Sequence, residues 1–250
     1  MSPLVSVVIP VYNRAEKILE AAASVQAQTY TDWEMVLVDD GSKDQTPQVL
    51  KELQQKDNRI RALFQENRGA QSARNAGIRA ARGEWVAFLD SDDQWLPRSL
   101  ELRLAKAEAE KVSAVYSTGT IILPDGTEKP YRPQGPSGRI YRRVLNSEGP
   151  MFQALLVRKS ALEKIGYLDE SIVAFQEWDT AIRLAKRFRF GFVPEATYLY
   201  DCSGTDTISK QFRRNGVGYE QVVRRNLWAI LLHLGPIGLA RHCENAASWY

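Results

Sequence analysis

Residues 85–93 read WVAFLDSDD, and this stretch decides the fold. Five apolar residues run directly into three carboxylates and a serine, so we expect a buried strand that ends abruptly in a polar turn. Similar strands are predicted at 5–9 (VSVVI) and 35–38 (MVLV), and they end at Pro10 and at Asp39-Asp40-Gly41. Continuous apolar runs of this length indicate parallel strands that are buried on both faces.

The segments between these strands have helical spacing. Apolar residues recur every three to four positions across 18–25, Pro47 marks the start of a second helix, and 61–64 (RALF) is predicted as a further strand. A third helix is expected at 70–80, where alanine and glycine on the inner side let the helix lie close to a sheet. This alternation predicts an α/β fold with a doubly wound, mainly parallel sheet.

The middle of the chain is less regular. A helix at 98–111 and a strand at 113–116 are predicted from their apolar spacing. The stretch 124–150 that follows is rich in proline and glycine, which indicates a surface loop or lid.

Regular structure is expected to resume after this loop. A strand is predicted at 153–157, followed by a short helix that Ser160 caps and Gly166 ends. An amphipathic helix at 178–188 and an extended segment at 192–200 complete the pattern.

The composition is that of a soluble globular protein. The 250 residues are 44% hydrophobic and 25% charged, and 33 basic against 30 acidic residues are too balanced to indicate a nucleic-acid partner. Cys202 and Cys243 show no disulfide or metal spacing, and no signal segment opens the sequence, so a reducing, cytoplasmic location is expected. The longest apolar run, 227–240, is shorter than the roughly 20 residues that a membrane-spanning helix needs.

Carboxylates gather where the predicted strands end. Ligands of open parallel sheets bind outside the carboxyl ends of the strands, and clustered carboxylates repel one another unless a cation lies among them. An extended backbone would point Asp90 and Asp92 the same way, and Mg²⁺ or Mn²⁺ favours one or two carboxylates together with substrate phosphates. The alternative is a solvated turn or a helix cap. The five residues concerned are Asp39, Asp40, Asp90, Asp92 and Asp93.

Four motifs follow one another along the first half of the chain. They are VSVVIPVYN at 5–13, VDDGS at 38–42, ENRGAQSARNAG at 66–77 and FLDSDD at 88–93. Together they resemble the nucleotide-sugar domain of family 2 glycosyltransferases, whereas neither the glycine-rich dinucleotide fingerprint nor the P-loop is present. The resemblance implies a GT-A fold, a divalent Mn²⁺ or Mg²⁺ cofactor, and inverting transfer of one sugar from a UDP-sugar to an acceptor hydroxyl. The implied setting is bacterial-type surface polysaccharide or glycolipid synthesis.

The same resemblance assigns roles in donor binding. Asp39 is similar to the carboxylate that receives the uracil imide, with Pro10 and Tyr12 lining the base pocket. Arg74 is similar to a residue near the uracil or the diphosphate, although a surface salt bridge would be its ordinary role. The remaining residues are Asp90, which faces the ribose, Ser91 beside it, and Asp92, which binds the metal.

A second set of implied roles concerns the acceptor. QEWD at 176–179 is similar to the acidic motif before Trp-Asp, in which the second acid is the catalytic base. That acid is Glu177 here, while Gln176 replaces the first acid of the common pattern. An acid that merely suits a helix N-terminus is the alternative. Ser203 and Ser209 lie in a segment that resembles a loop over the donor diphosphate, with turn-forming serines as the alternative.

The resemblance also divides the chain. Residues 1–210 are expected to form one catalytic domain, with a donor-binding half at 1–97 and an acceptor half at 98–210. A basic and apolar helical extension follows at 211–250. It suits peripheral contact with the inner face of the plasma membrane near a saccharide or lipid-linked saccharide acceptor, and the alternatives are packing on the catalytic domain or on a second subunit of a homodimer. Its arginines are Arg213, Arg214, Arg224 and Arg225.

Three other functions are weighed against this one. Processive synthases carry Gln-x-x-Arg-Trp and membrane spans, whereas QFRR at 211–214 is followed by Asn215, which favours one transfer per event. A catalytically silent nucleotide-sugar module would not need Asp92 and Glu177. A nucleotidyltransferase would need a glycine-rich basic loop after the first strand, where 11–13 reads VYN.

Overall fold

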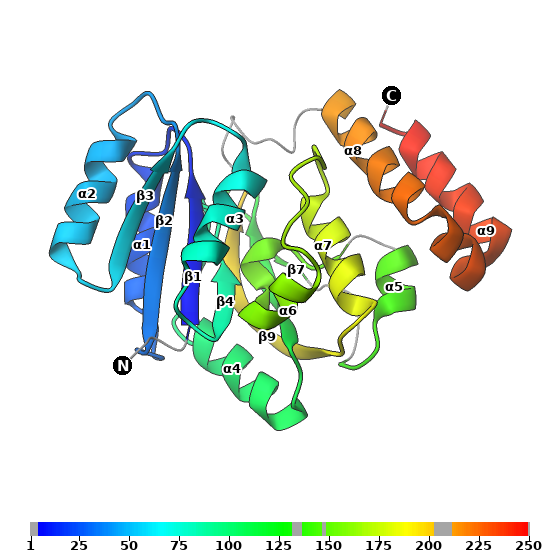
Figure 1. Ribbon diagram of the computed structural model, residues 1–250, viewed down its shortest axis with the longest axis horizontal. Coiled ribbons are helices and arrows are strands. Elements are labelled where there is room, and N and C mark those ends of the chain that lie inside the picture. Colours follow the sequence, from blue (N-terminus) through cyan, green and yellow to red (C-terminus); the bar gives the residue numbers. More distant parts are fainter. Residues whose placement is uncertain (1–4, 132–136, 147–148, 203–211, 250) are drawn as a thin grey trace.

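The structure is a computed structural model that describes residues 5–131, 137–146, 149–202 and 212–249. Its centre is a mixed sheet of nine strands in the described part, with the order β3-β2-β1-β4-β8-β6-β9-β5 and β7 paired to β6. Helices cover both faces of this sheet (Figure 1). The fold class that the sequence predicts, α/β with a doubly wound and mainly parallel sheet, is confirmed.

The first half forms the parallel part of the sheet. β1 pairs in parallel with β2 and β4, and β2 pairs in parallel with β3. The chain moves outward from β1 on one side and returns to its other side as β4, so the order of strands reverses between β1 and β4, where ligands of such sheets bind. The strands are β1 (Val5–Val11), β2 (Trp33–Asp40), β3 (Ile60–Gln65) and β4 (Trp85–Phe88), and the helices are α1 (Lys17–Gln26), α2 (Thr46–Lys56) and α3 (Ala70–Ala80).

The second half extends the sheet and adds helices. β8 runs antiparallel to both β4 and β6, whereas β9 is parallel to β6. The strands are β5 (Gln94–Trp95), β6 (Ala114–Ile122), β7 (Glu128–Tyr131), β8 (Leu156–Arg158) and β9 (Phe190–Asp201). The helices are α4 (Ser99–Glu110), α5 (Tyr141–Asn146), the 3₁₀ turn η1 (Phe152–Ala154), α6 (Lys159–Lys164), α7 (Gln176–Ala185), α8 (Phe212–Arg225) and α9 (Leu227–Ala247).

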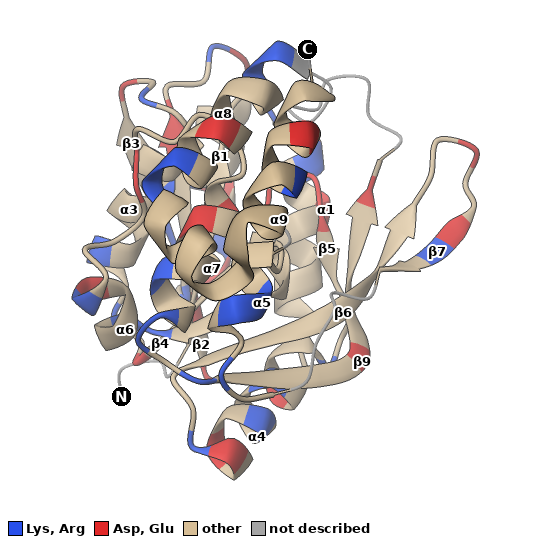
Figure 2. Ribbon diagram, turned by 90° about the vertical axis from the view of Figure 1, so that its right-hand side faces the viewer, with Lys and Arg blue, Asp and Glu red and all other residues tan. Residues whose placement is uncertain are grey.

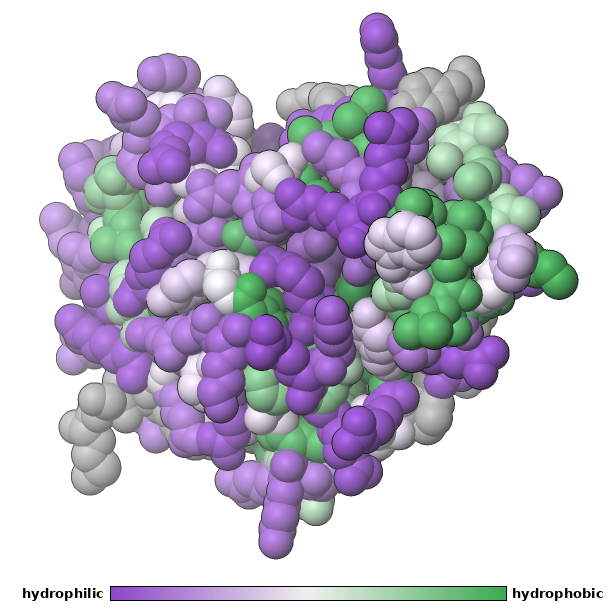
Figure 3. Space-filling model, turned by 45° about the vertical axis from the view of Figure 1, so that its right-hand side comes forward, coloured by the Kyte–Doolittle hydropathy of each residue, from purple (hydrophilic) through white to green (hydrophobic). Residues whose placement is uncertain are grey.

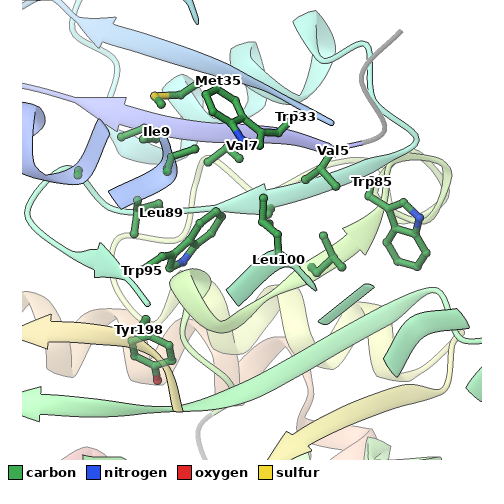
Figure 4. Close-up of a cluster of buried hydrophobic side chains, with 14 of the residues drawn as sticks. Val5, Val7, Ile9, Trp33, Met35, Trp85, Leu89, Trp95, Leu100 and Tyr198 are labelled. Carbon is green, nitrogen blue, oxygen red and sulfur yellow. The ribbon is translucent and has the colours of Figure 1, made fainter. Parts of the chain in front are cut away.

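β1 lies at the centre of the core because it is apolar on both faces. Val5, Val7 and Ile9 point into one cluster, which Figure 4 shows together with side chains of β2, β5 and α4. Val8 points to the other face, against α3. A Cβ on Gly77 of α3 would come within 2.4 Å of Val8 Cγ1, so the glycine lets α3 lie directly on the sheet, as its composition predicts.

The expected loop at 124–150 is only partly irregular. β-branched residues prolong β6 to Ile122, a turn follows in which the Gly126 N–H donates to the Leu123 carbonyl (2.8 Å), and β7 then pairs antiparallel with β6. α5 forms later in the same stretch because Val144 and Leu145 are buried. The expectation of a loop throughout is therefore wrong for the described residues.

Two local expectations after the loop are also wrong. The predicted strand at 153–157 begins as η1 because the Gln153 carbonyl accepts hydrogen bonds from Trp95 Nε1 (2.9 Å) and Arg103 Nη1 (3.2 Å) and leaves the sheet ladder. Ser160 lies inside α6 and does not cap it. The backbone N–H of Lys159 bonds instead to the Glu84 carbonyl (2.8 Å) at the start of this helix.

α8 and α9 stand at the end of the molecule opposite α2 (Figure 1). α8 lies against the segment before α7 so closely that a Cβ on Gly218 would be 2.6 Å from Ala174 Cβ. α9 bends at Gly235, where φ is 73°, and Pro236 follows. Among the described helices, none is long and apolar enough to cross a membrane.

Candidate functional site

The carboxyl ends of β1 and β2 bring the predicted base-binding residues together. Val11 pairs with Asp39 across the two strands, and the buried Pro10 precedes this pair. Tyr12 therefore follows at the same edge of the sheet, where its side chain is 44% exposed. An exposed ring beside a buried carboxylate suits stacking on a flat ligand.

The turn after β1 is joined to the turn after β2. Asn13, with φ at 50°, donates its N–H to Ser42 Oγ (2.9 Å), and its Oδ1 accepts from the Lys43 N–H (2.7 Å). Gly41 has φ at 74°, and a Cβ there would lie 2.8 Å from the Asn67 nitrogen. Only glycine fits this position easily.

The two adjacent aspartates after β2 have different surroundings. Asp40 accepts hydrogen bonds from Gln65 Nε2 (2.8 Å) and from the backbone N–H groups of Arg68 (2.9 Å) and Gly69 (2.8 Å). These bonds hold the loop that leads into α3. Asp39 is also buried, and within the described chain it accepts one long hydrogen bond, 3.3 Å, from the turn behind it. Asp39 rather than Asp40 therefore retains oxygen lone pairs for a ligand.

Arg74 and Asp90 form an ion pair within the site. Arg74 Nη2 lies 2.5 Å from Asp90 Oδ1, and Nη1 donates to Gln71 Oε1 (3.1 Å). The guanidinium also lies 4.3 Å from the centre of the Phe152 ring. Arg74 is thus buried between α3 and the turn after β4, and the alternative of a surface salt bridge is wrong.

The aspartates after β4 are gathered by a turn and not by an extended backbone. β4 ends at Phe88, and the Asp93 N–H donates to the Asp90 carbonyl (3.1 Å), which closes the turn around the buried Ser91. The expectation that extension aligns Asp90 with Asp92 is therefore wrong, although the two carboxylates do come close. Burial, with Asp90 nearby, raises the pKa of Asp92.

Negative charge is in excess around this turn. Burial, with Asp90 and Asp92 close by, raises the pKa of Asp93 well above its usual value, and Asp93 Oδ2 has no hydrogen-bond partner among the described residues. Asp201 from the end of β9 approaches, since its N–H lies 3.4 Å from Asp93 Oδ1. Nearby cations offset part of this charge: Arg14 Nε is 4.0 Å from Asp92 Oδ2.

These carboxylates fit a divalent metal that is shared with an anionic ligand. Asp92 is partly exposed and lies near other carboxylates, and a cation would reduce the repulsion between them. Within the described ranges, no three acidic, histidine or cysteine side chains group closely enough to hold a metal by themselves. Mg²⁺ prefers to be bound by one or two protein carboxylates together with phosphate oxygens of a substrate.

α7 carries the predicted base in its first turn. The residues around Glu177 are held by hydrogen bonds: Gln176 donates to a carbonyl of the preceding loop (2.8 Å), Trp178 Nε1 donates to a carbonyl of α5 (2.5 Å), and Asp179 accepts from Arg183 Nε (2.8 Å). Glu177 is half-buried between them, where the positive end of the helix dipole favours a carboxylate. An ionised acid in place of Gln176 could not donate this hydrogen bond.

Contacts between α3 and the loop before α7 connect the Arg74–Asp90 pair with the segment that carries Glu177. Asn75, which follows Arg74, donates from Nδ2 to the Leu168 carbonyl and to Glu170 Oε1 (both 2.9 Å), and its Oδ1 accepts from the Leu168 N–H (3.0 Å). α3 thereby fixes the segment that leads to Glu177.

Sequence patterns did not point to several neighbours of the site. Lys17 Nζ lies 3.2 Å from Asp201 Oδ2, and 184 positions separate the two residues, so no local spacing could reveal the pair. Asp93 is one of the five carboxylates that the sequence singles out, but neither its spacing nor the family resemblance assigned it a role of its own. Ser203 and Ser209, which were expected to face a diphosphate, lie outside the described residues.

Comparison with known proteins finds a matching family and similar chains. Residues 6–166 match the model of the family described as glycosyl transferase family 2. Over 120 residues, 48% of this chain and 47% of the relative, the chain is 39% identical to the UDP-Glc:α-D-GlcNAc-diphosphoundecaprenol β-1,3-glucosyltransferase WfgD of Escherichia coli. The chain spans about half the length of the first curated relatives that it matches.

Two solved structures share the fold. S. aureus TarS 1–349 in complex with UDP-GlcNAc superimposes with a TM-score of 0.74 and 23% identity, covering 92% of this chain and 67% of that one. The mannosyltransferase PcManGT from Pyrobaculum calidifontis, in complex with GDP-Man and Mn²⁺, gives a TM-score of 0.70 and 21% identity over 99% of this chain and 76% of the other.

Proposed function

Because the chain belongs to glycosyl transferase family 2, we propose that it moves one sugar from a UDP-sugar to an acceptor hydroxyl with inversion at the sugar carbon. The observation that carries this proposal is the Arg74–Asp90 ion pair beside the crowded carboxylates of Asp92 and Asp93. The cluster lies at the carboxyl end of β4, next to the point where the order of strands reverses. A cluster in that place suits a nucleoside diphosphate with a cation.

The donor would lie along the edge formed by β1, β2 and β4. Asp39 would accept the imide N–H of uracil, and Tyr12, above Pro10, would stack on the base. Asp90 would accept from the ribose hydroxyls while Arg74 holds its carboxylate in place, with Ser91 in the same turn. The E. coli relative and TarS, whose names include UDP-sugars, support uracil as the base, whereas PcManGT with GDP-Man makes guanine the competing choice.

Mn²⁺ or Mg²⁺ would be held by Asp92, with Asp90 and Asp93 adding negative charge nearby. When bound, the ion supplies charge compensation for the nucleoside diphosphate that leaves. The Mn²⁺ in the PcManGT complex supports this assignment.

Glu177 would act as the base for the acceptor. Its carboxylate removes the proton from the acceptor hydroxyl, and the hydroxyl oxygen attacks the sugar carbon on the face opposite the nucleoside diphosphate. The new C–O bond forms as the bond to the diphosphate oxygen breaks, so a single displacement inverts the configuration. Burial of Trp178 against α5 fixes the first turn of α7 and thus the direction of Glu177.

The name of one relative supports a class of acceptor. The E. coli relative is named for a diphosphoundecaprenol acceptor, which supports surface polysaccharide or glycolipid synthesis on the cytoplasmic side of a membrane. A catalytically silent module is disfavoured by the retained Asp92 and Glu177. A nucleotidyltransferase is disfavoured because the β1 turn, with Tyr12 and Asn13, lacks a basic glycine-rich loop.

A donor screen tests this function. The purified chain would be incubated with Mn²⁺ and each of UDP-glucose, UDP-galactose, UDP-N-acetylglucosamine and GDP-mannose, and the release of UDP, GDP and pyrophosphate would be measured. We expect UDP release from one UDP-sugar, lost on addition of EDTA. A parallel incubation with UTP and a sugar 1-phosphate tests the nucleotidyltransferase, because release of pyrophosphate from that pair would establish it instead. Binding of a donor without any turnover, with or without saccharide acceptors, would establish the silent module.

A further inference from the structure

α9 exposes three large apolar side chains, two before its bend at Gly235 and one after it. Trp228, Leu232 and Ile237, which we call the α9 face, are 80%, 81% and 78% exposed. Trp228 and Leu232 are four residues apart and therefore neighbours on the helix surface. Figure 3 shows hydrophobic side chains gathered on this side of the molecule. Single exposed apolar residues are ordinary, but a group of this kind indicates a binding surface.

α9 cannot turn this face inward, because its other side is already fixed in the core. Ile230 and His242 are buried there. His242 Nε2 lies 2.8 Å from the Leu145 carbonyl, and its Nδ1 lies 2.8 Å from the Tyr219 hydroxyl. Rotation of α9 would break both hydrogen bonds, so the α9 face stays at the surface.

Positive charge surrounds this face. α5, α8 and α9 together contain seven arginines and two glutamates, a balance of +5 in a chain whose total is +3. The stretch 227–240 itself contains no charged residue. Figure 2 shows basic segments on α5 and α8 beside the largely uncharged α9.

The arginines of these helices divide into two groups. Arg214 donates to the Val173 carbonyl (2.9 Å) and Arg225 pairs with Asp169, so these two hold α8 to the loop before α7 and do not serve a membrane. Arg142 of α5 and Arg213 of α8 are exposed, and so is Arg224 of α8, which also pairs with Glu220 on its own helix (3.1 Å).

We propose that the α9 face docks on an anionic bilayer surface, with α9 lying in the interface and the exposed arginines among the lipid headgroups. An apolar strip with a basic border and no spanning helix is the pattern of interfacial helices. A second copy of the chain fits less well, because a symmetric contact would place the two arginine borders opposite each other. This proposal concerns binding alone and stands whether or not the proposed reaction is correct.

Docking in this orientation would bring the catalytic helix near the membrane. The rings of His242 and Trp178 lie 5.7 Å apart and nearly parallel, and Trp178 follows Glu177 directly. α9 and the first turn of α7 are thus one packed unit, which suits an acceptor hydroxyl carried on a lipid.

Flotation with vesicles tests the apolar part of the proposal. The full chain would be mixed with vesicles of phosphatidylcholine alone or with added phosphatidylglycerol, without any sugar nucleotide. We expect it to float with the anionic vesicles, and the double variant Trp228→Ser/Leu232→Ser to lose at least about tenfold in affinity. Leu19→Ser, at a half-exposed position of α1, is the matched control and should float like the parent chain.

Fluorescence separates true insertion from weak adsorption. Anionic vesicles should shift the tryptophan emission of the parent chain to the blue, and Trp228→Phe should remove most of this shift. Four of the other five tryptophans, Trp33, Trp85, Trp95 and Trp178, are buried in the protein already, and the ring of the fifth, Trp249, lies 5.7 Å from that of Phe175. Arg142→Gln should weaken binding about fivefold, whereas Lys56→Gln on α2 should not.

Three results would overturn the proposal. They are absence of flotation with anionic vesicles, equal affinity for vesicles of phosphatidylcholine alone, and a concentration-dependent dimer in sedimentation that the Trp228→Ser/Leu232→Ser variant converts to monomer. The last result would assign the α9 face to self-association.

Discussion

The hydroxyl of Tyr219 and Nδ1 of His242 lie 2.8 Å apart inside the contact between α8 and α9. The other ring nitrogen, Nε2, must carry the proton, because it faces the Leu145 carbonyl, which can only accept (2.8 Å). The Tyr219 hydroxyl then donates to Nδ1. The fold therefore holds a neutral imidazole with one defined tautomer, and burial lowers the pKa of His242 below its usual 6.5.

This arrangement predicts a loss of stability in mild acid. Below about pH 6.5 the unfolded chain binds a proton on His242 that the folded protein resists, so the free energy of unfolding falls as the pH drops toward the lowered pKa of the folded state. We expect the stabilising contribution of His242 to fall between roughly pH 7.5 and 5.5. The measurement is chemical unfolding at a series of pH values.

Comparison with variants isolates the histidine. His242→Gln should be less stable at neutral pH by about 1–2 kcal/mol but should show a smaller loss on acidification. The exposed His233 serves as the control, and His233→Gln should keep the pH dependence of the parent chain. The raised pKa values of Asp92 and Asp93 act in the opposite direction, and they are common to all three proteins. Equal pH dependence in the parent chain and His242→Gln would contradict the assignment.

Replacement of Gly77 by alanine should destabilise the fold. The added Cβ would lie 2.4 Å from Val8 Cγ1, so α3 would have to move away from β1. Alanine favours a helix over glycine by about 1 kcal/mol, but overpacking costs roughly 1–3 kcal/mol, and we expect a net loss. Thermal unfolding measures it, with Ala76→Ser on the same helix as the control. A Tm equal to or above that of the parent chain would show that α3 does not lie so close.

Local sequence patterns predict the elements of the fold that depend mainly on residues close together in the sequence. β1, β2 and β4 are continuous apolar runs that end in turns, and the small residues of α3 indicate its close approach. The pattern fails at Gln153, because the side chains that take its carbonyl out of the sheet, Trp95 and Arg103, are about 50 positions away in the sequence.

In the candidate site too, single residues could be predicted from local motifs, whereas contacts between distant residues could not. The residues that resemble family motifs, such as Asp39 and Asp92, were predictable one by one. The Arg74–Asp90 pair and the approach of Asp201 to the Asp93 turn were not, since both depend on how separate elements meet. A motif identifies a residue type at the end of a strand, but the partner that sets its charge comes from elsewhere in the chain.

Glu177→Gln should separate donor binding from transfer. The amide has the same size but cannot take a proton, so we expect the donor Kd to change less than twofold while the transfer rate falls by roughly 10² to 10⁴. Isothermal titration with UDP and Mn²⁺ and a single-turnover assay measure the two quantities. Glu177→Asp should recover part of the rate, and Gln176→Ala should alter stability more than the chemical step, because the Gln176 amide bonds to the preceding loop (2.8 Å). Full transfer activity in Glu177→Gln would remove this residue from the mechanism.

Asp92→Asn should weaken donor binding and stabilise the protein at the same time. Asp92 lies close to Asp90 and Asp93. Repulsion between these carboxylates raises the free energy of the folded protein unless a cation lies between them. Loss of one carboxylate removes this repulsion, so we expect Tm without metal to rise by about 2–4 °C. The affinity for UDP in the presence of Mn²⁺ should fall by about 10 to 100-fold, while the affinity in EDTA should stay unchanged. Glu163→Gln, at an exposed position of α6, is the control for a simple change of net charge. An unchanged affinity with Mn²⁺ would refute the assignment of Asp92, and a fall in Tm would show that this carboxylate stabilises the turn.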